Sequence, residues 1–205
     1  DFGTNSFLLL VQEKQKDGSL STLHDESVIV RLGEGLETSR MISSEALSRA
    51  EQCLTEFEKT ISRFRPQKIQ AVSTAAAREA KNSKDFFAIC EKHGIPVVLI
   101  SGKEEAQMSY WGGIDPEERG RCLVLDIGGG STEAIVGEGK KIQFAESLPV
   151  GAVKMTEKFI QQQPTPIDQI ESLQKFLKTT CEKTWAELRI HKPEKMVAVA
   201  GAAPL

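Results

Sequence analysis

Two glycine-rich turns hold the residues best suited to chemistry in this chain. The first turn is Asp1-Phe2-Gly3-Thr4-Asn5-Ser6, and the second turn is Asp126-Ile127-Gly128-Gly129-Gly130-Ser131-Thr132-Glu133. In each turn a carboxylate comes first, glycines let the backbone approach a bulky anion, and hydroxyl groups add donors. An apolar, strand-like run follows each turn. Two such turns facing each other predict a cleft that binds a polyphosphate or a nucleotide.

The phosphate-binding groups predicted from these turns are backbone amides and hydroxyl donors. They belong to Gly3, Thr4, Asn5 and Ser6 in the first turn and to Gly128, Gly129, Gly130 and Ser131 in the second. The alternative for the glycine triplet is a plain hairpin. Its place directly after an aspartate and between two apolar strands favours phosphate binding.

The leading aspartates of the two turns, Asp1 and Asp126, hold corresponding places. Hard oxygen ligands suit Mg²⁺, which keeps several waters and commonly uses only one or two protein carboxylates. We therefore predict that Asp1 and Asp126 bind Mg²⁺ or another divalent metal, directly or through water. The alternative is that each aspartate only caps its turn by accepting hydrogen bonds from the following amides.

Two further side chains suit the attack of water on a phosphoryl group. Glu105 lies in the first turn of a predicted helix that follows a strand and a glycine turn, so its carboxylate is expected at the cleft edge as a general base. Its neighbour Glu104 reads as a solvated carboxylate at the helix start. Arg78 begins a helical stretch, and a guanidinium fork suits phosphate, although a solvent-facing arginine on a helix is the alternative.

Composition excludes several classes of protein. With 205 residues, 40% apolar and 27% charged, the chain is long enough for one large or two small globular domains. The net charge of -3 argues against a general nucleic-acid binder. No apolar stretch reaches the ~20 residues of a membrane span, so a cytoplasmic location is the default expectation. The cysteines lack metal-ligand spacing and are expected to be buried free thiols: Cys53, Cys90, Cys122 and Cys181.

Strand and helix patterns alternate along the chain and predict an α/β fold. Strands are predicted over residues 7–11, 27–32, 69–72, 97–100, 122–125, 132–136, 142–148 and 198–201. Helices are predicted over 47–64 with a cap at Ser43 or Ser44, and over 84–92, 103–111 and 153–161. A long last helix is predicted to open at Thr165-Pro166, with the Thr165 hydroxyl as its cap and Pro166 at its first position. Its predicted apolar face is made of Ile167, Ile170, Leu173, Leu177, Cys181, Trp185 and Leu188.

The order strand, turn, strand, strand, helix occurs twice and indicates two related lobes. The charged, turn-rich segment 115–120 is the expected boundary, giving an N-terminal lobe over 1–117 and a second lobe over 118–205. Asp1 opens the first turn without a preceding strand, and the last predicted strand runs directly into Gly201-Ala202-Ala203-Pro204. We therefore expect the second lobe to be incomplete at its C-terminal end.

Six ordered motifs resemble those of the exopolyphosphatase and guanosine pentaphosphate phosphohydrolase family. They are the first turn, Arg31-Leu32-Gly33-Glu34-Gly35, Thr74-Ala75-Ala76-Ala77-Arg78-Glu79-Ala80, Ser101-Gly102-Lys103-Glu104-Glu105-Ala106, the second turn and Ser147-Leu148-Pro149-Val150-Gly151-Ala152. The resemblance covers essentially the whole chain. It implies two actin-like, ribonuclease H-like lobes of mixed sheet flanked by helices, with a cleft between them.

The resemblance also implies an activity and roles for particular residues. It implies hydrolysis of terminal phosphoanhydride bonds in polyphosphate or guanosine pentaphosphate with a divalent metal. Glu105 matches the catalytic glutamate, Asp126 and Glu133 match acidic site positions, and Arg78 matches a phosphate-binding arginine. A surface carboxylate at a strand start is the alternative for Glu133. The 201–204 segment lacks the hydroxyl usual in the corresponding turn of the family, which weakens a prediction of ribose binding there.

Two other functions remain open at this point. A non-catalytic sensor could bind polyphosphate or a phosphorylated alarmone and regulate a partner. An ATP-dependent sugar kinase shares the paired-turn architecture but lacks a glutamate in the context in which Glu105 occurs. We expect no membrane or nucleic-acid partner, and the oligomeric state is open, with a homodimer among the options.

Overall fold

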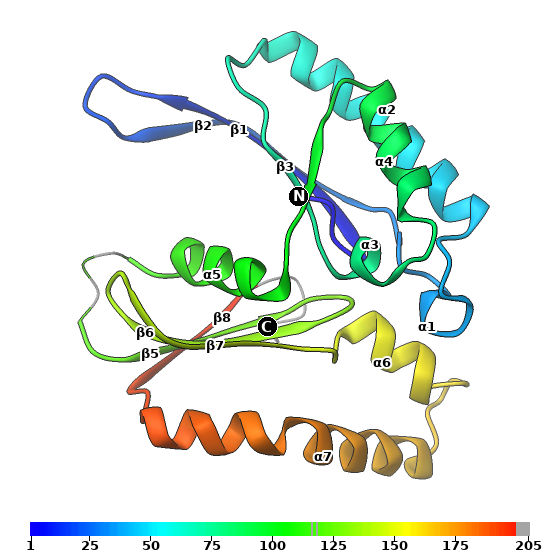
Figure 1. Cartoon of the computed structure of the whole chain (residues 1–205), viewed down its shortest axis with the longest axis vertical. Helices are drawn as coiled ribbons and strands as arrows, with labels where there is room; N and C mark the ends of the chain where they lie inside the picture. The colour runs from blue at the N-terminus through cyan, green and yellow to red at the C-terminus, as the bar shows by residue number, and fades with distance from the viewer. Residues whose placement is uncertain (116, 118, 200–205) are drawn as a thin grey trace. The chain divides into compact units, whose positions relative to one another are not determined.

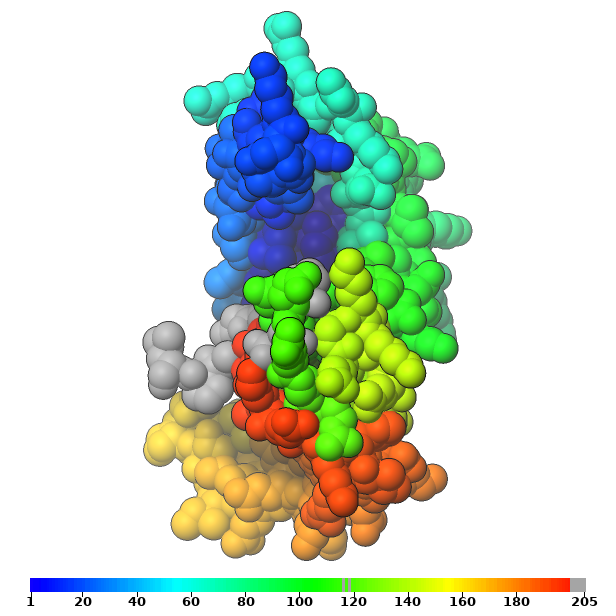
Figure 2. Space-filling model, turned by 90° about the vertical axis from the view of Figure 1, so that its left-hand side faces the viewer, coloured from blue at the N-terminus to red at the C-terminus, as the bar shows by residue number. Residues whose placement is uncertain are grey.

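An antiparallel hairpin follows the first turn in the computed structural model, which describes residues 1–115, 117 and 119–199. The chain divides into an N-terminal unit, Asp1–Leu99, and a C-terminal unit, Ile100–Leu205. The hairpin strands are β1 (Ser6–Lys14) and β2 (Leu20–Ile29), drawn in blue in Figure 1 and exposed at the surface of the N-terminal unit in Figure 2. A shorter parallel pair joins β3 (Ala71–Ser73) to β4 (Val97–Leu99).

Phe2 connects the two strand pairs of the N-terminal unit. It forms an antiparallel bridge with Phe7 and a parallel bridge with Ser73, and its amide donates to the Val72 carbonyl at 2.8 Å. The Ser73 hydroxyl also donates to the Phe2 carbonyl at 3.0 Å. The first turn is therefore anchored in the sheet at the place where the sequence shows no preceding strand.

Helices α1 (Leu36–Ser39), α2 (Ser44–Phe64), α3 (Ala75–Glu79) and α4 (Ser83–Lys92) complete the N-terminal unit. Helix α2 begins at the predicted cap, since the Ser43 hydroxyl accepts a hydrogen bond from the Ala46 amide. It ends where Arg65 takes a left-handed conformation with φ of 47°. In the core the rings of Phe2, Phe7 and Phe86 lie with centroids 4.7 to 5.7 Å apart.

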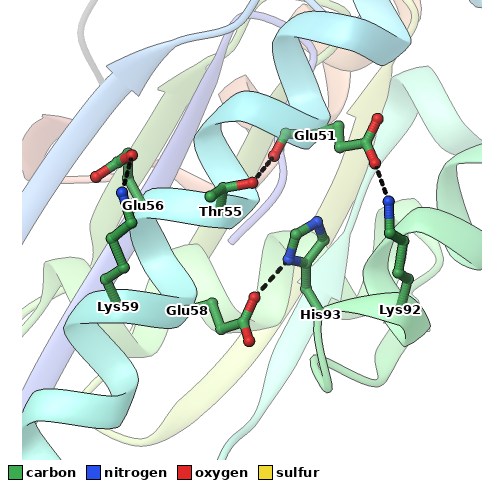
Figure 3. Close-up of polar contacts among 7 residues, drawn as sticks. All are labelled: Glu51, Thr55, Glu56, Glu58, Lys59, Lys92 and His93. Carbon is green, nitrogen blue, oxygen red and sulfur yellow. Dashed lines mark hydrogen bonds and ion pairs between the residues drawn. The ribbon is translucent and has the colours of Figure 1, made fainter.

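Polar contacts connect the outer side of α2 with the C-terminal end of α4 (Figure 3). Glu51 pairs with Lys92 at 2.5 Å, and Glu58 pairs with His93 at 2.7 Å. The Glu51–Lys92 pair is exposed, and a pair of this kind contributes only about 0–1 kcal/mol, whereas the His93 side chain is only 9% exposed. The buried apolar faces of the helices therefore hold them together, and the pairs align the end of α4, after which Gly94 turns the chain at φ of 67°.

The C-terminal unit contains one four-stranded sheet in the order β7-β6-β5-β8. Its strands are β5 (Cys122–Ile127), β6 (Thr132–Glu138), β7 (Lys141–Leu148) and β8 (Lys195–Val199). Its helices are α5 (Gly102–Gly113), α6 (Ala152–Phe159) and α7 (Ile167–His191). In Figure 1, α5 lies on one side of this sheet and α7 on the other.

Alternation along the strands sends side chains to these two faces. Val124 and Ile135 pack under Ala106 and Tyr110 of α5. Their sequence neighbours on β5 and β6 pack on the opposite face with Leu188 of α7. Along each strand, alternate residues therefore pack against α5 and against α7.

The two units repeat one topology. In the C-terminal unit β5 pairs antiparallel with β6 and parallel with β8. In the N-terminal unit Phe2 pairs antiparallel with Phe7 of β1 and parallel with Ser73 of β3. Phe2 and β5 therefore occupy the same place in the two sheets, and each immediately precedes a glycine-rich turn.

The division between the units falls earlier than the boundary expected after residue 117. It lies between Leu99 and Ile100 because α5 packs against β5, β6, β7 and β8. Segment 115–120 instead connects α5 to β5, and residues 116 and 118 lie outside the described part. Glu105 therefore belongs to the same unit as the second turn.

Two other expectations differ from the structure, and a third lies outside its described residues. The strand expected over 27–32 ends at Ile29, and Val30 and Leu32 are buried in the loop that follows. Pro166 is the N-cap of α7 rather than its first helical residue, and no side chain caps this helix. The last strand ends at Val199 in the described residues, so the expected 201–204 turn lies outside them.

The apolar face predicted for α7 is partly wrong. Ile167, Ile170 and Trp185 are 74%, 40% and 42% exposed. For Trp185 the reason is visible at Thr184, which is buried and donates to a Glu146 carboxylate oxygen at 2.6 Å, so the adjacent Trp185 points away from the sheet. Cys181 and Leu188 are buried as predicted.

The predicted state of the cysteines is confirmed, since all are buried and free: Cys53, Cys90, Cys122 and Cys181. Among the described residues, none of the helices combines the length and apolarity that a membrane span requires.

Asn82 makes a buried contact that positions α3, and its removal should be costly. Its side chain accepts from the Ile42 amide at 2.8 Å and donates to the Ile42 carbonyl at 3.0 Å. Asn82→Ala leaves two buried backbone groups without these partners, and we expect a loss of about 2 kcal/mol in the free energy of unfolding. Urea denaturation measures it, with the exposed Lys84→Ala as control. Equal losses in both variants would contradict the assignment.

Candidate functional site

The same hydrogen bond closes both glycine-rich turns. In the first turn the Gly3 amide donates to the Ser6 carbonyl at 3.1 Å, and in the second the Gly128 amide donates to the Ser131 carbonyl at 3.0 Å. A Cβ on Gly3 or Gly128 would lie 3.0 or 3.2 Å from that carbonyl oxygen. A side chain at either position would therefore push the turn backbone away by a few tenths of an ångström, which glycine avoids.

Other carbonyl groups of the turns are bound from one side. The first amides of α6 reach the second turn, where Ala152 donates to the Gly128 carbonyl at 2.9 Å and Lys154 to the Gly129 carbonyl at 3.1 Å. In the first turn the Gly33 amide donates to the Thr4 carbonyl at 2.9 Å. The carbonyl oxygens are thus held in fixed directions in both units.

The amides of the turns are left as donors. In the part of the chain that the structure describes, the N–H groups of Gly129 and Gly130 donate no hydrogen bond, and neither do those of Thr4 and Asn5. The second turn does connect antiparallel strands, as the hairpin alternative holds. It differs from a plain hairpin because its carbonyls are already bound and its amides remain available as hydrogen-bond donors, and an anion site needs such donors.

Two glycines outside the turns keep this geometry. A Cβ on Gly151 would collide with the backbone of Gly129 and Gly130. A Cβ on Gly33 would collide with the Thr4 side chain and would lie 3.6 Å from the Cβ of Ala76 in α3. Helix α3, which carries Arg78, therefore packs beside the first turn.

Three polar side chains lie on the α5 face of the C-terminal sheet. Asp126 on β5 is directly opposite Glu133 on β6, and Glu133 is directly opposite Ser147 on β7. Directly opposed residues project to the same face. The Ser147 hydroxyl donates to Glu133 Oε1 at 2.6 Å, so the row is connected beside the second turn.

Glu133 is the buried member of this row. Only 1% of it is exposed, which excludes the alternative of a surface carboxylate. Burial, together with the charges of Glu105 and Asp126, raises the pKa of Glu133 to about 7, against hydrogen bonds from Ser147 and Ser131 that lower it. Three carboxylates thus influence one another next to the second turn.

Helix α5 positions Glu105 toward this row. Its start is a capping box, in which Glu104 accepts from the Ser101 amide at 2.8 Å and the Ser101 hydroxyl accepts from the Glu104 amide. The hydrogen bonds that the Glu104 carboxylate accepts from the Ser101 amide and from the Ser101 hydroxyl lower the pKa of Glu104, which is exposed, as predicted. Glu105 follows as a half-buried carboxylate on the next position of the helix.

The structure brings together the site residues predicted in the C-terminal unit: Glu105, Asp126, Glu133, Gly128, Gly129, Gly130 and Ser131. Those of the N-terminal unit lie on or beside the first turn: Asp1, Gly3, Thr4, Asn5, Ser6 and Arg78. The pairing of Asp1 with Asp126 stays a prediction.

Sequence reasoning missed Ser109 and Ser147 as partners of the acidic row. The Ser109 hydroxyl donates to Asp126 Oδ2, and Ser147 donates to Glu133. The signal for Ser109 was its spacing, one helical turn after Glu105. The signal for Ser147 was its place at the head of a motif.

The donor set fits a hard divalent cation, because it consists of carboxylate oxygens around Asp126. Among the described residues, no group of three or more His, Cys, Asp and Glu could hold a metal ion. A cation bound here would therefore use one or two protein carboxylates and water. The capping alternative for Asp126 has no support, since its described hydrogen bond comes from Ser109.

Comparisons with known families and solved structures show which proteins this chain is similar to. A model of the Ppx/GppA phosphatase family matches residues 10–203. A solved exopolyphosphatase-like protein is similar at 27% identity with a TM-score of 0.90, over 98% of this chain and 64% of that chain. An exopolyphosphatase from Cytophaga hutchinsonii is similar at 26% identity with a TM-score of 0.89, over 97% of this chain and 64% of that chain.

A Ppx/GppA family member from Aquifex aeolicus is similar at 29% identity with a TM-score of 0.72, over 98% of this chain and 64% of that chain. The chain thus spans 64% of the length of these three proteins. The ethanolamine utilization protein EutJ from Carboxydothermus hydrogenoformans, 15% identical with a TM-score of 0.50, shares the fold alone. The expected actin-like α/β fold of mixed sheets flanked by helices is confirmed.

Gly151→Ala should displace the second turn, because the added methyl has no room beside Gly129 and Gly130. We expect a loss of about 1–3 kcal/mol in the free energy of unfolding, measured with urea. Gly112→Ala is the matched control in the same unit, since nothing lies within 4 Å of its Cβ and alanine favours a helix. A Gly151→Ala protein as stable as the control would show that the turn can move aside.

Glu133→Gln should change how stability depends on pH. The folded pKa of Glu133 of about 7 lies above the unfolded value of 4.5, so the folded state binds more protons between these values. The contribution of Glu133 to the free energy of unfolding is fully present below pH 4.5 and is lost as the pH rises through 7. Between pH 4 and pH 8 the wild type should lose on the order of 1–3 kcal/mol relative to Glu133→Gln, in urea titrations with a chelator. Parallel stability curves would contradict the raised pKa.

Proposed function

Because the chain belongs to the Ppx/GppA phosphatase family, we propose that it is a phosphohydrolase that removes the terminal phosphate from inorganic polyphosphate. One observation carries the proposal. Glu105 and Asp126 both act electrostatically on the buried Glu133, beside a turn in which the amides of Gly129 and Gly130 donate no hydrogen bond in the described structure. A site with phosphate donors and a base next to it suits hydrolysis better than binding alone.

In the proposed reaction each part of the chain has one task. The amides of Gly129 and Gly130 hold oxygens of the terminal phosphate, where their fixed direction stabilises developing charge. Glu105 orients a water molecule and accepts its proton as the water oxygen attacks phosphorus. The bond from phosphorus to the bridging oxygen breaks, and orthophosphate and a chain shorter by one phosphate leave.

The buried carboxylate supports the base rather than acting as a second one. Glu133 is held by Ser147 and lies opposite Asp126, so it keeps the row in place and adds negative potential near Glu105.

Asp126 would hold a divalent cation, with Asp1 as the partner ligand predicted from the sequence. Mg²⁺ is the best match to carboxylate and water ligands, and when bound it would neutralise phosphate oxygens. In the N-terminal unit, Arg78 and the amides of Thr4 and Asn5 are the groups that we propose bind phosphate.

Polyphosphate is the preferred substrate, and guanosine pentaphosphate is the second candidate. The residues proposed to bind substrate are amides, hydroxyls and one guanidinium, which suit phosphate groups and offer nothing that reads a guanine base. The similar protein from Cytophaga hutchinsonii is named an exopolyphosphatase, which supports the same order.

Glu105→Gln should lower the rate of phosphate release about 10²–10⁴-fold, because the amide cannot accept the proton of water. The measurement is orthophosphate release from polyphosphate with Mg²⁺. Glu104→Gln is the matched control, because glutamine preserves a capping box and Glu104 is exposed.

The outcomes separate the possible functions. Equal rates for the wild type and Glu105→Gln would reject Glu105 as the base. Tight polyphosphate binding by a wild type without turnover would favour a regulator over an enzyme. ATP-dependent phosphorylation of a sugar would favour a kinase.

A further inference from the structure

A serine links the helix of the proposed base to the aspartate of the second turn. Ser109 lies on α5 four positions after Glu105, and residues at this spacing share one side of a helix. The Ser109 hydroxyl donates to Asp126 Oδ2 at the end of β5. A single side chain therefore connects the two elements that carry the catalytic carboxylates.

We propose that Ser109 is a positioning residue that sets the direction of the Asp126 carboxylate and the distance of Glu105 from it. The inference rests on the proposed hydrolase function and deepens it by adding a residue outside the motifs. Ser109 acts through Asp126 and α5, and it does not touch the substrate.

The direction of the hydrogen bond carries the first step of the argument. A hydroxyl has one proton, so Ser109 cannot also donate to a carbonyl of its own helix, which is the usual role of a serine within α-helices. Its proton is committed to Asp126, half-buried like Ser109 itself. A hydrogen bond to an ionised acceptor is stronger than one between neutral groups.

The remaining oxygen of Asp126 carries the second step. With Oδ2 bound by Ser109, the rotation of the carboxylate about its last bond is restricted, and Oδ1 is left to face a cation or a water molecule. A freely rotating carboxylate would have to lose that freedom each time a ligand binds. With Ser109 present, the Asp126 carboxylate loses this rotational freedom once, when the protein folds.

The packing of α5 carries the third step. Ala106 and Tyr110 hold the helix on the sheet by apolar contacts, and the Tyr110 hydroxyl donates to the Gly139 carbonyl at 3.0 Å. These contacts fix the height of the helix on the sheet, and the Ser109 hydrogen bond ties the helix to Asp126 at the turn end of β5. Loss of that contact should change the site without unfolding the unit.

Ser109→Ala, Ser109→Thr and the control Met108→Ala test the inference. Met108 is 49% exposed on the same helix, so Met108→Ala should leave turnover unchanged. Alanine is a good helix former, and circular dichroism checks that each variant folds. The rate of orthophosphate release from polyphosphate is measured together with the affinity for Mn²⁺ alone, read by its electron paramagnetic resonance.

For Ser109→Ala we expect kcat to fall about 10–100-fold while KM for polyphosphate stays within about twofold, since the turn amides that bind phosphate are unchanged. Mn²⁺ affinity should fall about 10-fold or more. Ser109→Thr keeps a hydroxyl and should restore both values to within about fivefold of the wild type. Ser109→Ala added to Asp126→Asn should have no further effect on either value.

The failure of this inference differs from the failure of the proposed function. An active wild type with unchanged kcat and Mn²⁺ affinity in Ser109→Ala overturns the inference alone. A wild type without turnover whose Mn²⁺ affinity still falls in Ser109→Ala overturns the hydrolase proposal and supports the positioning role. A wild type that shows neither turnover nor Mn²⁺ binding overturns both. If Ser109→Ala does not fold, Ser109→Thr with the wild-type values supports the role, and a loss in it overturns the role.

Discussion

The hydrogen bonds from the first turn of α6 to the carbonyls of Gly128 and Gly129 set the direction of the whole second turn. The first amides of any helix have no partner within it, and here they are used on the neighbouring backbone rather than on a ligand. Because the carbonyls are bound on one side, the amides of the turn are left available. The proposed anion site is therefore formed by the amides of the turn, and α6 supports the turn without binding the anion itself.

The carboxylates beside that turn are costly to keep in place. Glu133 is buried with only hydroxyl donors, and its neighbours Asp126 and Glu105 carry charge of the same sign. A fold that accepts such a cost gains a strongly negative, partly dry patch next to donors for an anion. This combination attracts a cation and a phosphate together, which neither group of residues would do alone.

The chemistry was easier to predict from sequence than the limits of its scaffold. Glu104 and Glu105 could be assigned different roles from their position in the helix, because a capping box depends only on local spacing. The unit to which Glu105 belongs could not be assigned, since the packing of α5 on the β5–β8 sheet is a long-range contact. Trp185 was misplaced for a related reason, because a buried Thr184–Glu146 hydrogen bond, invisible in an apolar pattern, turns it outward.

The pairing register of the β5–β6 hairpin has a consequence for variation in this chain. Asp126, Glu133 and Ser147 share one face only because they are directly opposed across neighbouring strands. A shift of register by one residue would move Glu133 to the face covered by α7 and bring Ala134 beside Asp126. Insertions or deletions in the Gly128–Ser131 segment should therefore be far less tolerated than in the exposed turn between β1 and β2, even though both segments connect antiparallel strands.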